Sequence, residues 1–98
     1  MLDPLEQQDI TEKARQQLST IIDPEIGRSI VEMGLIYLVE IDFEGNVSII
    51  MTTTTKGCPA AGFLTEAVKA CLACVPGVRN VDVTLTYEPM WRPEMMEA

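Results

Sequence analysis

The sequence contains no histidine among its 98 residues. Histidine is the commonest general base of enzymes and the commonest metal ligand, so its absence excludes every catalytic arrangement built on a Ser/His or Cys/His pair. Any enzymatic chemistry at a thiol of this chain would need another base, and Asp23 and Glu25 are the only evident carboxylates for that role.

Cysteine is scarce, and no long apolar run is present. Three cysteines are an odd number and do not form a disulfide framework, so we expect reduced thiols in a reducing compartment. No apolar run reaches the ~18 residues needed to cross a bilayer, and the first residues, MLDPLE, are acidic and lack the apolar core of a signal peptide. These features predict a cytoplasmic protein with no membrane partner.

Basic side chains are also few. Seven Lys and Arg residues stand against fifteen Asp and Glu residues, which gives a formal net charge of -8. Because binding to nucleic acid depends on cationic side chains that neutralise phosphates, this balance argues against a nucleic-acid partner. The composition, 47% hydrophobic and 22% charged, is that of a folded protein.

The length predicts one domain over residues 1–98, near the small end for a single core, so a dimer or another obligate partner is plausible. Residues 88–98 form a C-terminal tail rich in proline and methionine. We expect no regular structure there, but Trp91 and its neighbouring methionines predict that the tail packs near a functional site or on a partner.

Hydrophobic periodicity predicts the secondary structure. After a polar lead-in over residues 1–8, the capping-box spacing of Asp9 and Glu12 predicts a helix that ends at Asp23, before a proline. The elements predicted after it are a helical turn over 29–34, strands over 35–42, 47–52 and 81–87, and a helix over 59–75.

The first two strands are separated by a short turn, which predicts an antiparallel hairpin. A right-handed crossover through the second helix makes the third strand parallel to the second, and antiparallel to the first if it lies beside the first. The predicted fold is therefore α+β, a two-layer αββαβ sandwich in which two helices cover one face of a three-stranded sheet.

The main candidate site is the stretch TTTTKGCPAA over residues 52–61, which joins a predicted strand to a predicted helix. Pro59 suits the first helical position, so Cys58 is expected to be the N-cap. The positive end of the helix dipole and the nearby Lys56 would then favour the thiolate of Cys58. The alternative is that Cys58 is buried and acts as a small hydrophobic residue, as a lone cysteine usually does.

Residues beside this stretch are weaker candidates. Threonines 52–55 carry hydroxyl groups into the loop before Cys58, although such a run is most often a strand end that faces water. The segment 23–27, DPEIG, is typical of a capped turn. Asp23 and Glu25 would alternatively project an acidic edge toward a metal or a partner.

Cys71 and Cys74 have the spacing of a CxxC motif in the last turns of the second helix. A redox pair normally lies at a helix N-terminus, and a structural zinc site needs four ligands, so neither role is favoured. A helical wheel places Cys71 in the middle of the buried face and Cys74 on its flank, which predicts two core cysteines.

Five separate segments are, taken in order, similar to one family. They are DPEI at 23–26, GLI at 34–36, MTTTTKGCP at 51–59, PGV at 76–78 and PxW at 89–91. Together they resemble the small iron-sulfur cluster assembly domains that include bacterial SufT and PaaD and their eukaryotic cytosolic relatives. The similarity extends over about residues 10–96, almost the whole chain.

The resemblance implies a non-catalytic factor that assembles or carries iron-sulfur clusters, with the assembly machinery and client apoproteins as partners. It assigns the motif cysteine to Cys58, as a metal ligand, the motif acid to Asp23, and Thr52 and Thr54 to the adjoining cofactor-binding segment. A cluster normally takes four protein ligands, and this chain offers one good one. Either two chains share a labile cluster in a homodimer, or the domain acts without holding a cluster.

Two other functions stay open from the residues. In the first, the protein is a thiol-dependent enzyme with Cys58 as its nucleophile, which requires a covalent adduct with a substrate. In the second, the protein is a non-metal adaptor whose tail with Trp91 docks a client, and Cys58 has no role.

Overall fold

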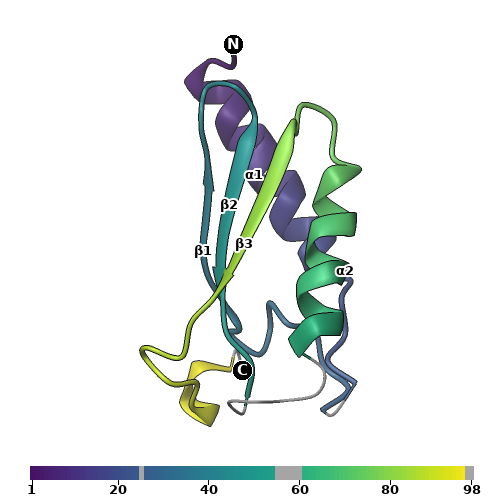
Figure 1. The fold of residues 1–98 in the computed structure, drawn as a ribbon, viewed down its shortest axis with the longest axis vertical. Helices are drawn as coiled ribbons and strands as arrows, with labels where there is room; N and C mark the ends of the chain where they lie inside the picture. The colour runs from purple at the N-terminus through teal and green to yellow at the C-terminus, as the bar shows by residue number, and fades with distance from the viewer. Residues whose placement is uncertain (25, 55–60, 97–98) are drawn as a thin grey trace.

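Two helices and a three-stranded sheet make up the computed structural model, which describes residues 1–24, 26–54 and 61–96 (Figure 1). The order of elements confirms the predicted αββαβ arrangement. Within the described residues, no helix has the length and apolar character needed to cross a membrane. The elements are α1 (Pro4–Leu18), β1 (Ile36–Ile41), β2 (Asn46–Met51), α2 (Ala61–Ala73), β3 (Asn80–Leu85) and a short 3-10 helix (Pro93–Met95).

Helix α1 begins at Pro4, well before the predicted start, so the polar lead-in over residues 1–8 is wrong. The capping box is formed by Asp3 and Glu6: the Asp3 carboxylate accepts from the Glu6 N–H at 2.8 Å, and the Glu6 carboxylate accepts from the Asp3 N–H at 3.3 Å. Asp9, the predicted cap, lies inside α1 and forms an ion pair with Lys13 at 3.0 Å. The sequence contains two capping-box patterns in succession, and the first, which is followed by Pro4 at the first helical position, caps the helix.

Helix α1 also ends five residues before Asp23, the predicted end. The hydroxyl groups of Ser19 and Thr20 donate to the carbonyl oxygens of Gln16 and Gln17, each at 2.6 Å. These hydroxyls satisfy carbonyls that would otherwise accept from the next helical turn, so the chain leaves the helix there.

We predict that Asp3→Ala lowers the free energy of unfolding by about 1 kcal/mol, because two main-chain N–H groups lose their arrangement in the capping box. Asp9→Ala is the matched control. It removes only an exposed ion pair, worth roughly 0.3–0.5 kcal/mol. Urea unfolding followed by circular dichroism compares the two variants, and a larger loss for Asp9→Ala would contradict the start of α1 at Pro4.

The sheet has the order β1-β2-β3, with β2 in the centre. The predicted hairpin is confirmed: β1 and β2 are antiparallel and are joined by a turn around Asp42. The Asp42 carboxylate accepts from the main-chain N–H groups of Glu44 and Asn46, each at 2.9 Å, and from the side-chain amide of Asn46 at 2.8 Å. The side-chain bond from Asn46 is the main cause that lowers the pKa of Asp42.

Strand β3 is parallel to β2, as predicted, and lies beside β2 rather than β1. The register pairs Asn46 with Asn80 at one end and Met51 with Leu85 at the other. Strands β2 and β3 therefore end together, and the segments that follow them leave the sheet at the same edge.

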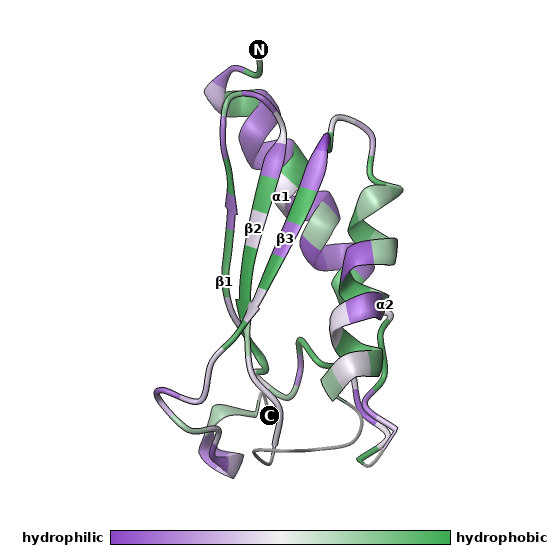
Figure 2. Ribbon diagram, in the orientation of Figure 1, coloured by the Kyte–Doolittle hydropathy of each residue, from purple (hydrophilic) through white to green (hydrophobic). Residues whose placement is uncertain are grey.

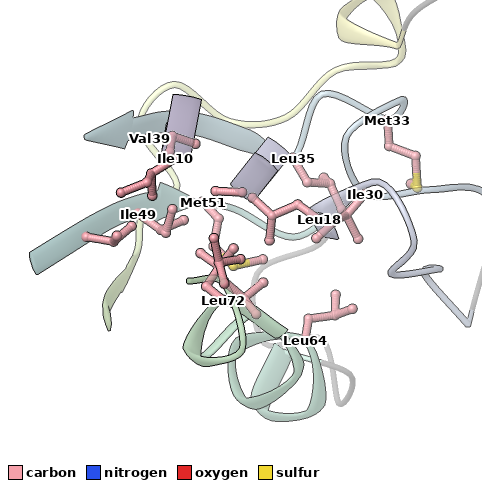
Figure 3. Close-up of a cluster of buried hydrophobic side chains, with 14 residues drawn as sticks. Ile10, Leu18, Ile30, Met33, Leu35, Val39, Ile49, Met51, Leu64 and Leu72 are labelled. Atoms are coloured by element: carbon pink, nitrogen blue, oxygen red, sulfur yellow. The ribbon is translucent and has the colours of Figure 1, made fainter. Parts of the chain in front are cut away.

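Both helices lie on one side of the sheet, which confirms the predicted two layers (Figures 1 and 2). Alternate residues of β2 are buried against them, and side chains from α1, the sheet and α2 point toward one another (Figure 3). The core contains Ile10, Ala14, Leu18, Ile30, Met33, Leu35, Val39, Val47, Ile49, Met51, Leu64, Val68, Leu72 and Val75.

The buried face of α2 differs from the wheel prediction. Leu72 is fully buried, whereas Cys71 is half-buried and Cys74 is exposed, so the prediction of two core cysteines is wrong. Helix α2 packs against α1 as well as β3, and this pair of contacts turns its buried face by one residue toward Leu72. A helical wheel uses only the hydrophobicity of the residues of one helix, so it cannot show on which side a second helix packs.

Candidate functional site

The candidate site lies at the end of the molecule where β2 ends and α2 begins, at the lower end of Figure 1. The loop that follows α1, the end of β3 and the C-terminal tail also reach this end (Figure 1). Segments far apart in the sequence, which carry most of the motif residues, are thus brought to one end of the sheet.

Thr52 and Thr53 fasten the end of β2 to its neighbours. The Thr52 N–H donates to the carbonyl of Leu35 at 2.9 Å, and the Thr52 hydroxyl lies 3.3 Å from the carbonyl of Thr53. The Thr53 hydroxyl forms a hydrogen bond of 2.9 Å with the hydroxyl of Tyr87. Both threonines are buried, so the interpretation of this run as a strand end facing water is wrong for them.

Thr54 is half-buried and is followed by residues 55–60, which lie outside the described part of the chain. The predictions that Cys58 caps a helix, that Pro59 begins it and that Lys56 favours the thiolate fall on these residues and stay predictions. The described flanks establish that the segment connects the end of β2 to Ala61, the first residue of α2.

Asp23 is buried, with 1% of its surface exposed, in the loop after α1. Its N–H donates to the carbonyl of Arg28 at 2.9 Å, and its carbonyl accepts from the N–H of Gly27 at 2.8 Å. These bonds close the loop, and Ile22 and Ser29 pair across it. The predicted turn is confirmed, and Glu25, the other acidic candidate, lies outside the described residues.

The C-terminal tail packs on its own chain beside this end of the sheet. The Trp91 indole Nε1–H donates to the carbonyl of Met33 at 2.6 Å, and the Tyr37 hydroxyl donates to the carbonyl of Pro89 at 2.7 Å. A Cβ on Gly34 would lie 3.1 Å from the carbonyl carbon of Met95, so the tail passes directly over this glycine. The tail is packed, on its own chain, whereas the prediction that it lies near a functional site or on a partner stays a prediction. The 3-10 helix over Pro93–Met95 corrects the expectation of no regular structure.

The described residues do not supply a complete metal site. No group of three or more His, Cys, Asp or Glu side chains that could hold a metal ion occurs among them. A cluster bound through Cys58 would therefore require ligands from beyond the described residues, either from the undescribed segments or from another chain.

Comparison with known proteins identifies the family. The model of the iron-sulfur cluster assembly protein family matches residues 11–85. The chain belongs to this family. The resemblance inferred from the five sequence segments is thereby confirmed.

Members of the iron-sulfur cluster assembly family resemble this chain over most of its length. An Fe-S protein maturation auxiliary factor of Porphyromonas gingivalis is 42% identical over 81 residues, which cover 83% of this chain and 77% of that protein. The Fe-S protein maturation auxiliary factor SufT of Staphylococcus aureus is 40% identical over 76 residues, 78% of this chain and 86% of that protein. The crystal structure of a domain of unknown function from Bacillus anthracis superposes with a TM-score of 0.89 at 38% identity and covers 96% of this chain and 90% of that one.

Sequence reasoning missed two residues that make contacts at the candidate site. The hydroxyl of Tyr87 binds Thr53, and the hydroxyl of Tyr37 holds the tail. The chain has only two tyrosines, and each follows or begins a strand next to a motif segment, which was the available signal. Local periodicity places a tyrosine on a strand but cannot identify its partner on another element.

Proposed function

We propose that this protein is a non-catalytic assembly or carrier factor for iron-sulfur clusters, and that it uses Cys58 as its cluster ligand. The observation that carries the proposal is the likeness, at 40% identity or more, to two proteins named as Fe-S protein maturation auxiliary factors. The cluster is the cargo, and client apoproteins and the cluster assembly machinery are the partners.

The architecture supports a role for the loop around Cys58. Its N-terminal flank is held by the bonds of Thr52 to Leu35 and of Thr53 to Tyr87, and its C-terminal flank begins α2. One of these anchors is a main-chain bond and the other joins two side chains, and together they fix where the chain leaves the sheet. We assign Thr52 and Asp23 positioning roles, because both are buried, and we keep the half-buried Thr54 as a candidate contact of the cargo.

One good thiol ligand is too few for a cluster, which normally takes four protein ligands. We propose that two chains share a labile cluster in a homodimer, each contributing Cys58.

Anaerobic reconstitution with iron and sulfide tests this proposal. We predict that the wild type gains a visible charge-transfer absorption with one cluster per two chains, and that Cys58→Ala loses essentially all of the bound iron. Iron and sulfide analysis, together with native mass spectrometry of the dimer, provides the measurement.

Cys74→Ala is the matched control, because it removes an exposed thiol far along α2 from the loop. It should bind as much iron as the wild type. If Cys58→Ala retains the cluster, Cys58 is not the ligand. If the wild type binds no iron, the protein does not carry clusters directly, and its clients should then be sought by co-purification.

A further inference from the structure

A second pair of thiols lies outside the candidate site. Cys71 is in the last turn of α2, and Cys74 follows the end of that helix, at the opposite end of α2 from its first residue, Ala61. The function proposed for the family does not use these two thiols. Their surroundings differ from those expected of core cysteines.

The backbone at the end of α2 brings the two cysteines close together. The Cys74 N–H donates to the Cys71 carbonyl at 3.4 Å, and the Val75 N–H donates to the Leu72 carbonyl at 3.0 Å. Such i→i+3 bonds tighten the turn, so that side chains three residues apart lie one above the other, about 6 Å apart along the axis. Disulfides join Cα atoms that are about 4.4–6.8 Å apart, so the backbone spacing is within range. The Cβ atoms must also approach to about 3.5–4.5 Å, so closure requires the Cys71 side chain to leave the Gln17 carbonyl and tilt toward Cys74.

The two thiols have different environments. The half-buried Cys71 has its Sγ 3.4 Å from the Gln17 carbonyl oxygen of α1, where the thiol donates a weak hydrogen bond, whereas Cys74 is exposed to solvent. Burial is the main cause that raises the pKa of Cys71; a hydrogen bond with Thr20 lowers it, and the charge of an ionised Cys74 raises it further.

We propose that Cys71 and Cys74 form a redox-active dithiol that reduces a low-molecular-weight disulfide and closes into an intramolecular disulfide. Exposure makes Cys74 the attacking group and Cys71 the resolving group. This pair acts independently of Cys58 and of any cluster.

The chemistry is thiol–disulfide exchange. The Cys74 thiolate, after giving its proton to solvent, attacks one sulfur of the small disulfide, breaks its S–S bond and expels one thiolate. The Cys71 thiol then loses its proton and attacks the Cys74 sulfur, which expels the second thiolate. Two electrons pass from the pair to the small disulfide, which becomes two thiols by taking up the two protons.

Oxidised glutathione is the probe for the test, and the full-length Cys58→Ala variant keeps the pair as the only thiols of the chain. The folded protein is oxidised, free thiols are alkylated, and trypsin cleavage after Lys69 and Arg79 releases both cysteines in one peptide, residues 70–79. We expect this peptide to lose two hydrogen atoms and to resist alkylation until it is reduced, while circular dichroism shows that the chain remains folded.

Cys71→Ser and Cys74→Ser are the controls, each with one thiol of the pair. Cys71→Ser should stop at a stable glutathione adduct on Cys74, and Cys74→Ser should react slowly because Cys71 is half-buried. Three results would overturn the proposal: a lasting adduct on Cys74 when Cys71 is present, disulfide-linked dimers in place of the internal bond, or closure only in denaturant. The parent chain with Cys58 gives the same peptide 70–79, so the outcome does not depend on cluster binding.

Discussion

Leu72→Ala is expected to lower the free energy of unfolding by about 2–5 kcal/mol, the cost of leaving a cavity in a well-packed core. Leu72 is fully buried at the end of α2, among side chains from the sheet and α1 (Figure 3). Domains of this kind are stable by about 5–15 kcal/mol in total, so the change removes a large part of the stability. Urea or guanidinium unfolding, followed by circular dichroism, measures the difference.

The neighbouring cysteines provide matched controls on the same helix. Cys74→Ala removes an exposed side chain and should change the free energy of unfolding by no more than about 0.5 kcal/mol. Cys71→Ala should lie between the two. A larger loss for Cys71→Ala than for Leu72→Ala would show that the buried face is centred on Cys71, as the periodicity of the helix alone predicts.

Gly34→Ala is the second substitution with a large expected effect. Gly34 has a φ of 75°, in the left-handed region, where a side chain costs about 1–2 kcal/mol. An added Cβ would also contact the Met95 carbonyl, which is main chain and cannot turn aside as a side chain can. We expect overpacking to add roughly 1–3 kcal/mol and to displace the tail. The chain has one tryptophan, Trp91, so its fluorescence reports the release of the tail directly.

Gly27→Ala separates the two causes. Gly27 has a φ of 80°, but a Cβ there would have no atom within 4 Å, so this variant has only the backbone cost and should leave the Trp91 fluorescence unchanged. In a chain that ends at Arg92, Gly34→Ala should be no worse than Gly27→Ala. If Gly34→Ala still costs more in the shortened chain, contact with Met95 is not the reason.

The strands were predictable to within two residues at each end, because each strand has one apolar face and the period of two is strong. The alternation of Val47, Ile49 and Met51 is the clearest case, and all three are buried. The position of β3 beside β2 could be stated only conditionally, because a parallel direction follows from the crossover whereas the choice of neighbour depends on packing.

The errors in the helices have a different cause. Asp3 with Glu6 and Asp9 with Glu12 have the same capping spacing, so the spacing alone does not identify the box that caps α1. For α2 the decisive fact was the direction of α1, which places Leu72 in the core and leaves Cys74 in solvent.

The sequence names candidate residues for the site, and these stay predictions, but it does not specify their contacts. The family segments single out Cys58 as a candidate, which stays a prediction, and the family itself is confirmed. The burial of Thr53 depends on Tyr87, 34 positions along the chain, and the position of Trp91 depends on a main-chain carbonyl. No local pattern specifies such partners.

The contacts of the tail also bear on the order of events during synthesis. Trp91 and Met33 are 58 positions apart, and Tyr37 and Pro89 are 52 apart, so each of these bonds closes a loop of more than half of the 98 residues. On a ribosome the N-terminal part of a chain emerges first. Helix α1 and the hairpin can therefore form on the nascent chain, whereas Gly34 is covered only after residues 91–95 have emerged.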